Sequence, residues 1–212
     1  VGSEMCIRDS YWVPNLNLKP ENNITREIGA GIQLDGLLTG NDRLQLKGGY
    51  FGTDARNYIA TRVDMKRMRS YSYNVSRARI WGWDMQGNYQ SDYFDWMLSY
   101  NRTESMDASS REWLGSGNPD TLISDISIPV GHGGVSAGWR AELSAAATHV
   151  KKGDPHQAGY AVHSFSLSYK PVSVKGFEAS VTLDNAFNKL AMNGKGVPLS
   201  GRTVSLYTRY QW

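Results

Sequence analysis

Apolar and polar side chains alternate along several stretches of this chain, which is the pattern of β-strands with one apolar and one polar face. In the last stretch, Val204, Leu206 and Tyr210 share one side, while Ser205 and Arg209 share the other. Two further stretches, at 133–140 and 142–150, are poorer candidates because they are rich in Gly and Ala. The pattern predicts about nine strands in all. The clearer ones are 27–34, 43–50, 81–89, 94–101, 164–169, 177–187 and 204–212.

The connections between these strands alternate between short and long. Short turns are predicted at 37–42, 91–92, 140–142 and 171–176, and long polar stretches at 52–75, 105–132, 151–160 and 188–200. An outer-membrane barrel has tight periplasmic turns at one rim and long extracellular loops at the other. The alternation therefore favours an all-β transmembrane antiparallel barrel, with a soluble lipocalin-like or lectin-type fold as the alternative.

Strand register decides which side chains would face lipid, because a shift of one residue exchanges the two faces. We expect an interior lined by Glu178, Thr182, Asp184, Ser205 and Arg209. The side chains expected to face lipid are Trp81, Trp83, Trp96, Leu98, Val181, Leu183 and Leu206.

Composition fits strands rather than helices. Aromatic residues make up 11% of the chain and hydrophobic residues 40%, with 22 Gly against 7 Pro and a mean hydropathy of −0.48. The sequence contains no run of 18 apolar residues, so it predicts no transmembrane helix. The net charge of +3 is too small to indicate a nucleic-acid partner.

The first ten residues, VGSEMCIRDS, differ from the rest of the chain. They show no strand or helix period, resemble a translated adaptor sequence, and contain Cys6, the single cysteine. One cysteine supports neither a disulfide framework nor a cysteine-type metal site. We expect residues 1–10 to be non-native, with the native sequence beginning at residue 11.

Three motifs resemble those of TonB-dependent outer-membrane receptors. The run NLNLKPE at 15–21, followed by Glu27 and Gly29, is similar to the family's NPNLKPE element. The segment YFGTDARNYI at 50–59 also resembles the family's sequences. So does LDNAFNK at 183–189, together with GRTVSLYTRYQW at the end of the chain. The resemblance covers residues 11–212 and implies about nine C-terminal strands of a barrel of about 22.

Within that family, haem and haemoglobin receptors carry a second box upstream of this element, with a haem-ligating His between the two. The upstream half would precede Tyr11, so only the second box can be assigned, with Leu16 where the family has Pro. A siderophore receptor has the same barrel and stays open as an alternative, as does a non-transport barrel of the autotransporter or porin type. The box gives the candidate ligand-binding residues Asn15, Leu16, Asn17 and Leu18.

The resemblance also implies partners. The plug and the segment that contacts TonB would precede this chain, and TonB would supply the energy for importing an iron-bearing ligand, haem or a ferric siderophore. Outer-membrane lipid and lipopolysaccharide would surround the barrel. The last strand, which ends at Trp212, resembles the signal recognised by the outer-membrane assembly machinery.

Three loop residues are candidates for further ligand contacts. His156, in KKGDPHQAG, could ligate a haem iron, Trp113 could offer a stacking surface, and Arg67 belongs to a basic set that could pair with haem propionates or lipopolysaccharide phosphates. No two of the four histidines have the spacing of a metal site, and no catalytic or nucleotide-binding motif appears, so we predict no enzyme. The basic set is Arg62, Lys66, Arg67, Arg69, Arg77 and Arg79.

Overall fold

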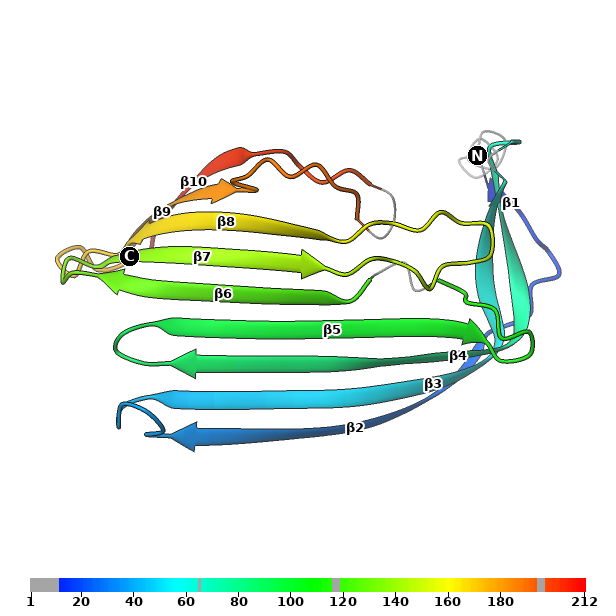
Figure 1. Ribbon diagram of the computed structural model, residues 1–212, viewed down its shortest axis with the longest axis horizontal. Helices are drawn as coiled ribbons and strands as arrows, with labels where there is room; N and C mark the ends of the chain where they lie inside the picture. The colour runs from blue at the N-terminus through cyan, green and yellow to red at the C-terminus, as the bar shows by residue number, and fades with distance from the viewer. Residues whose placement is uncertain (1–11, 65, 116–118, 194–196) are drawn as a thin grey trace.

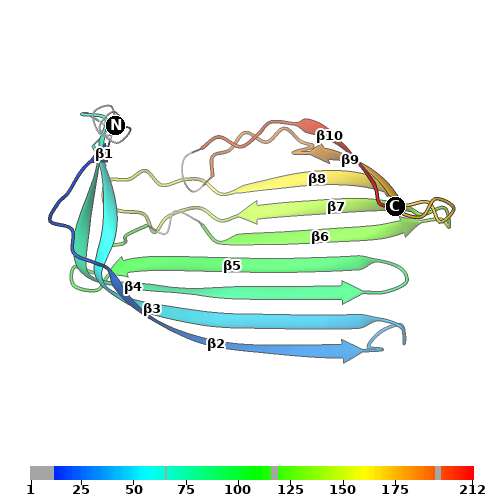
Figure 2. The same ribbon diagram turned by 180° about the vertical axis from the view of Figure 1, so that it is seen from behind.

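A computed structural model describes residues 12–64, 66–115, 119–193 and 197–212. The predicted non-native segment 1–10 lies outside these residues. Within them the chain forms one curved 10-stranded sheet (Figures 1 and 2). Its strands are β1 (Trp12–Val13), β2 (Asn22–Asp35), β3 (Arg43–Asp64), β4 (Arg69–Gln90), β5 (Asp95–Asp107), β6 (Thr121–Val130), β7 (Val135–Ser144), β8 (Tyr160–Tyr169), β9 (Phe177–Asp184) and β10 (Thr203–Tyr210).

From β2 to β10 each strand pairs antiparallel with the next one in the chain, and the short β1 adds to β4 in parallel. A sheet of this order has two edges, β2 and β10, whose backbone groups have no partner strand. Lipid cannot satisfy such edges, so a membrane-spanning form needs further strands to close the barrel. The sheet is therefore a partial barrel. No helix in the described part of the chain is long and apolar enough to cross a membrane.

The alternating stretches at both ends of the chain are strands, as predicted, but several predictions in the middle are wrong. The stretch 105–132 was expected to be one long loop, yet it contains β6, which pairs with β5 and β7. Ile123 and Pro129 fall on the more polar side of β6, so its alternation is weak. The turn expected at 140–142 lies inside β7, and the strand expected at 142–150 ends at Ser144. The true turn, between Val130 and Val135, has positive φ at Gly131 and Gly134.

The stretch 52–75 is also not a loop, because β3 and β4 continue through it as a long hairpin. Outside a membrane both faces of a strand meet water, so these residues need not alternate. Asn57, with φ of 52°, interrupts the extended backbone of β3. Figure 1 shows the outer part of the hairpin turning away from the sheet and running across the ends of neighbouring strands.

Leu114 fills the inside of this bend. It is 7% exposed and packs with Ala55 and Ala78 below the bend and with Ala60 and Val75 above it. Strand register places Ala55 and Ala78 on the polar face of the sheet. The outer hairpin therefore bends toward the polar face.

The register confirms the predicted division into two faces. Opposite residues of antiparallel strands share a face, and following the pairs from β4 to β10 places every side chain predicted to face lipid on one side and every predicted interior side chain on the other. The apolar side suits lipid, and the polar side suits the interior of a barrel.

The inner ends of β2 to β5 are tied together by polar contacts between turns. Asn41 donates through Nδ2 to both carboxylate oxygens of Asp92, and the Tyr89 hydroxyl donates to Asp42 Oδ2 over 2.8 Å. Burial alone would raise the pKa of Asp42, but hydrogen bonds from Tyr89 and from the Leu38 amide hold that pKa below its ordinary value. These contacts fix the short turns at this end of the sheet.

Candidate functional site at the outer end of the sheet

The box at residues 15–18 lies along the outer part of β4. Asn15 donates through Nδ2 to the Ser72 carbonyl over 3.0 Å, and its Oδ1 accepts the Asn17 amide over 3.0 Å. The second bond closes a turn in which the side chain stands in for a backbone carbonyl. Leu18 is half-buried, whereas Leu16 is 96% exposed. The box thus has one anchoring side chain, Asn15, and one fully presented apolar side chain, Leu16.

The rest of the NLNLKPE run continues the attachment. Asn74 accepts the Lys19 amide at Oδ1 over 2.7 Å and donates through Nδ2 to the carbonyls of Lys19 and Asn57. Glu21 Oε2 accepts the Ile59 amide over 2.8 Å. The bonds of Asn15, Lys19 and Glu21 to the hairpin join residues that lie 38 to 57 positions apart. The run therefore acts as a brace that fixes the bent hairpin to the start of β2.

Two further loops pack under the same hairpin. The Ala108 amide donates to the Arg77 carbonyl over 2.9 Å, and Lys151 Nζ donates to the Thr61 carbonyl. Burial lowers the pKa of Lys151 from its usual value. The loops 108–115 and 145–159 thus reach the hairpin from the strands on its other side.

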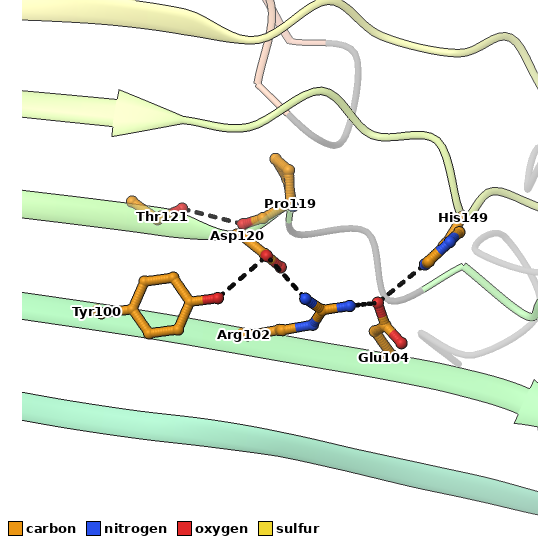
Figure 3. A network of polar contacts seen from close by, with 7 residues as sticks. All are labelled: Tyr100, Arg102, Glu104, Pro119, Asp120, Thr121 and His149. Carbon is orange, nitrogen blue, oxygen red and sulfur yellow. Dashed lines mark hydrogen bonds and ion pairs between the residues drawn. The ribbon is translucent and has the colours of Figure 1, made fainter. Parts of the chain in front are cut away.

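A network of charged groups links β5 to the residues just before β6 and to the loop 145–159 (Figure 3). Arg102 forms ion pairs with Glu104 and, over 3.5 Å, with Asp120, which also accepts the Tyr100 hydroxyl over 3.1 Å. His149 Nδ1 lies 2.8 Å from Glu104 Oε1. Glu104 is nearly buried, and the Arg102 guanidinium compensates its charge, while the His149 imidazole lies within hydrogen-bond distance of the same carboxylate.

Trp113 packs against this network and does not face the interior. Its ring stacks on His149 with centroids 4.0 Å apart, and lies 6.0 Å from the ring of Trp81. Glu104 is directly opposite Trp81, so the register places the pair on the lipid-side face. The predicted stacking surface at Trp113 is thus covered by His149 and points out of the barrel.

The other predicted loop residues lie apart. Arg67 sits in the tip of the outer hairpin, where its amide donates to Asp64 Oδ1 over 3.1 Å, and its side chain is exposed. His156 is exposed in the loop 145–159. In the described ranges, no hydrogen bond, ion pair or ring contact joins either residue to the box. The basic set is divided between the hairpin tip and the lipid-side face of β4, where Arg77 and Arg79 lie.

Sequence analysis assigned no role to His149. A signal was present: Glu104 falls in the apolar phase of its strand, and an acid there needs a cationic partner. Among the residues that the structure describes, no cluster of three or more His, Cys, Asp or Glu could hold a metal ion.

A curved antiparallel sheet with one apolar face, one polar face and elaborated connections at one end defines a piece of an outer-membrane β-barrel. The family model "TonB dependent receptor-like, beta-barrel" matches residues 7–188. The chain belongs to this family, whose members are outer-membrane proteins of Gram-negative bacteria and transporters rather than enzymes.

Named relatives agree. The chain is 43% identical over 204 residues to the "Hemin receptor" of Yersinia pestis, covering 96% of this chain and 30% of that protein. It is 26% identical over 214 residues to "TonB-dependent heme receptor A" of Haemophilus influenzae strain KW20, covering 86% and 29%. The chain thus spans about a third of the length of these relatives.

Solved structures support the fold. The chain matches "Copper transporter OprC" with a TM-score of 0.76 at 21% identity, covering 92% of this chain and 32% of that one. It matches the pyoverdine receptor FpvA of Pseudomonas aeruginosa PAO1 with a TM-score of 0.67 at 17% identity, covering 96% and 32%. At these identities the likeness defines the barrel and not the ligand.

Proposed function

We propose that this chain is the C-terminal barrel region of a receptor that imports haem through the outer membrane, driven by TonB. The observation that carries the proposal is the 43% identity to a hemin receptor over 96% of the chain, which includes the outer loops as well as the membrane strands. The plug and the TonB-contacting segment belong to the part of the receptor beyond this chain. The final strand, β10, which is followed by the exposed Trp212, serves recognition by the assembly machinery.

The brace gives residues 15–18 two separate roles in this function. Asn15 holds the bent hairpin on the interior side of the sheet, where an incoming ligand passes. Leu16, which is almost fully exposed, contacts the ligand. Arg67 and His156 offer an exposed cation for a propionate and an exposed imidazole for iron. Trp113 faces outward and supports the loop beside His149.

Growth assays test the proposal in a host that lacks its own haem receptors. The full-length receptor should allow growth with haem as the sole iron source, and deletion of TonB should abolish it. Growth on a ferric siderophore but not on haem would replace haem with a siderophore as the substrate. Growth on haem that persists without TonB would contradict active transport.

Single substitutions separate the two roles of the box. Leu16→Ser should reduce haem uptake while leaving hydrogen exchange of the hairpin amides unchanged. Asn15→Ala should reduce uptake and also speed exchange in residues 70–74, because the bond to the Ser72 carbonyl is lost. Unchanged uptake in both variants would remove the box from the ligand path.

A further inference from the structure

Three arginines pair with one carboxylate on the lipid-side face, and a fourth, Arg56, lies two positions from that carboxylate on the same face, at the outer end of β2 and in the middle of β3 and β4 just below the bend. Asp54 Oδ1 lies 3.1 Å from Arg77 Nη2 and 3.7 Å from Arg79 Nε, and Asp54 Oδ2 lies 3.5 Å from Arg26 Nη1. Arg56 is exposed and has no ion pair within the described residues. We call Arg26, Arg56, Arg77 and Arg79 the arginine cluster.

The arginine cluster carries more positive charge than the neighbouring acidic side chain neutralises. Arg56 and Arg77 are directly opposite each other in the register, and like charges at opposite positions destabilise a sheet. Asp54 is the one acid that pairs with the cluster among the described residues. The side chains of Arg26, Arg77 and Arg79 are each more than half exposed, so their guanidinium groups keep free donors. An external anion would offset this excess charge.

The position of the cluster indicates what that anion is. Just inward on the same face lie Trp81, Trp83 and Tyr50, and the rings of Tyr50 and Trp83 are 4.7 Å apart. Aromatic side chains of this kind mark the edge of the hydrocarbon layer. The arginines therefore lie at the height of the lipid headgroups, not in the interior through which a ligand would pass.

The opposite end of the same face provides an internal comparison. The lipid-side residues at the inner ends of β2 to β10 carry no charge in the described strands. They are Leu34, Leu44, Tyr89, Trp96, Val130, Val135, Tyr169, Phe177 and Tyr210. A face that is charged at the outer end alone suits a membrane whose outer leaflet is the more anionic one.

We propose that the arginine cluster binds the phosphate groups of lipopolysaccharide in the outer leaflet. Guanidinium groups form paired hydrogen bonds to phosphate oxygens, and these are strong where water is partly excluded. The apolar and aromatic surface inward of the cluster would receive the acyl chains of the same molecule. The site is distinct from the haem path, because it lies on the opposite face of the sheet from the bent hairpin.

Binding of lipid A to the full-length receptor in detergent tests this site. The probes are lipid A with both phosphates and the same lipid A after enzymatic dephosphorylation. The phosphorylated form should bind the wild type more tightly. The triple variant R56Q/R77Q/R79Q should bind it at least about tenfold more weakly, as expected for the loss of several charge-assisted hydrogen bonds.

A matched control removes the same charge from the polar face. The triple variant R43Q/R140Q/R209Q replaces three arginines that pair with Asp35, Asp125 and Gln211. It should bind phosphorylated lipid A like the wild type. The heat-dependent shift of the folded barrel on gels shows whether each variant assembles. If R56Q/R77Q/R79Q fails to fold, the single variants R77Q and R79Q replace it, and each is expected to weaken binding.

Three outcomes would overturn the proposal. The first is equal affinity of the wild type for the two lipids. The second is wild-type affinity in the R56Q/R77Q/R79Q variant or in both single variants. The third is equally tight, cluster-dependent binding of inorganic pyrophosphate, which would indicate a site for soluble phosphate and not for lipid.

Discussion

The two faces of this sheet carry different side chains and meet different surroundings. On the polar face, the strands are short of apolar contacts except at the bend, where Leu114 packs against small side chains. On the lipid-side face, large apolar and aromatic side chains stay exposed because the membrane is their solvent, and in the described strands charge appears only toward the outer end. The comparison shows that burial in the isolated chain does not indicate which side is the interior. The chemistry of each face, carried through the register, does.

Adjacent residues of β9 test this contrast with the largest expected effect. Val181→Arg puts a cation on the lipid-side face near mid-membrane and should lower the free energy of unfolding of the receptor in lipid vesicles by about 2–4 kcal/mol. Ser180→Arg, one position away on the polar face, should cost far less. Denaturant titrations of both variants measure the difference, and equal costs would contradict the assignment of the faces.

A second pair of neighbours tests the bend. Leu114→Ala should destabilise the packing under the outer hairpin by about 2 kcal/mol, at the low end for a buried Leu because its neighbours are small. Hydrogen exchange of the amides of residues 58–62 and 71–75 should then speed up. Trp113→Ala, on the other face, should leave these amides protected and disturb only the region of His149. Faster exchange in the Trp113 variant alone would show that the hairpin bends toward the lipid-side face, contrary to the assignment made above.

A smaller, pH-dependent effect is expected at the inner turns. Because the folded-state pKa of Asp42 is below the ordinary value of about 3.9, its ionised form stabilises the fold above that value. This contribution is lost as the pH falls through the lower folded-state pKa. Thermal unfolding between pH 7 and pH 2 should show a steeper acid-side loss in the wild type than in Tyr89→Phe, which lacks the donor to Asp42. Parallel curves would show that this hydrogen bond does not set the pKa.

Local pattern predicted the terminal strands well and the middle of the chain poorly. The residues from Val204 to Tyr210 alternate, with Tyr207 and Thr208 as the exceptions, because each face meets one environment throughout. In β6, Ile123 on the polar face and Pro129 near the end hide the period, and in the outer halves of β3 and β4 no membrane imposes one. Strand periodicity therefore reports the membrane-spanning part of a strand and not its full length.

The candidate site was predictable in its motif but not in its geometry. The NLNLKPE run stood out in the sequence, yet its attachment to Asn74 depends on a hairpin more than 50 residues away. No local sequence pattern predicts a contact between residues so far apart in the chain. His149 could have been paired with Glu104 only by knowing which acid lies in the apolar phase of β5 and which loop passes over it.

Paired cysteine labelling tests the central claim most directly, namely that the register divides an interior from a lipid surface. In the full-length receptor with native cysteines removed, single cysteines at Thr182 and Leu183 are exposed to a membrane-impermeant thiol reagent in intact outer membranes. The account predicts reaction at position 182, which faces the water-filled interior, and silence at 183, which faces lipid. Reaction at 183 with silence at 182 would reverse the two faces, and with them both the haem path and the lipopolysaccharide site.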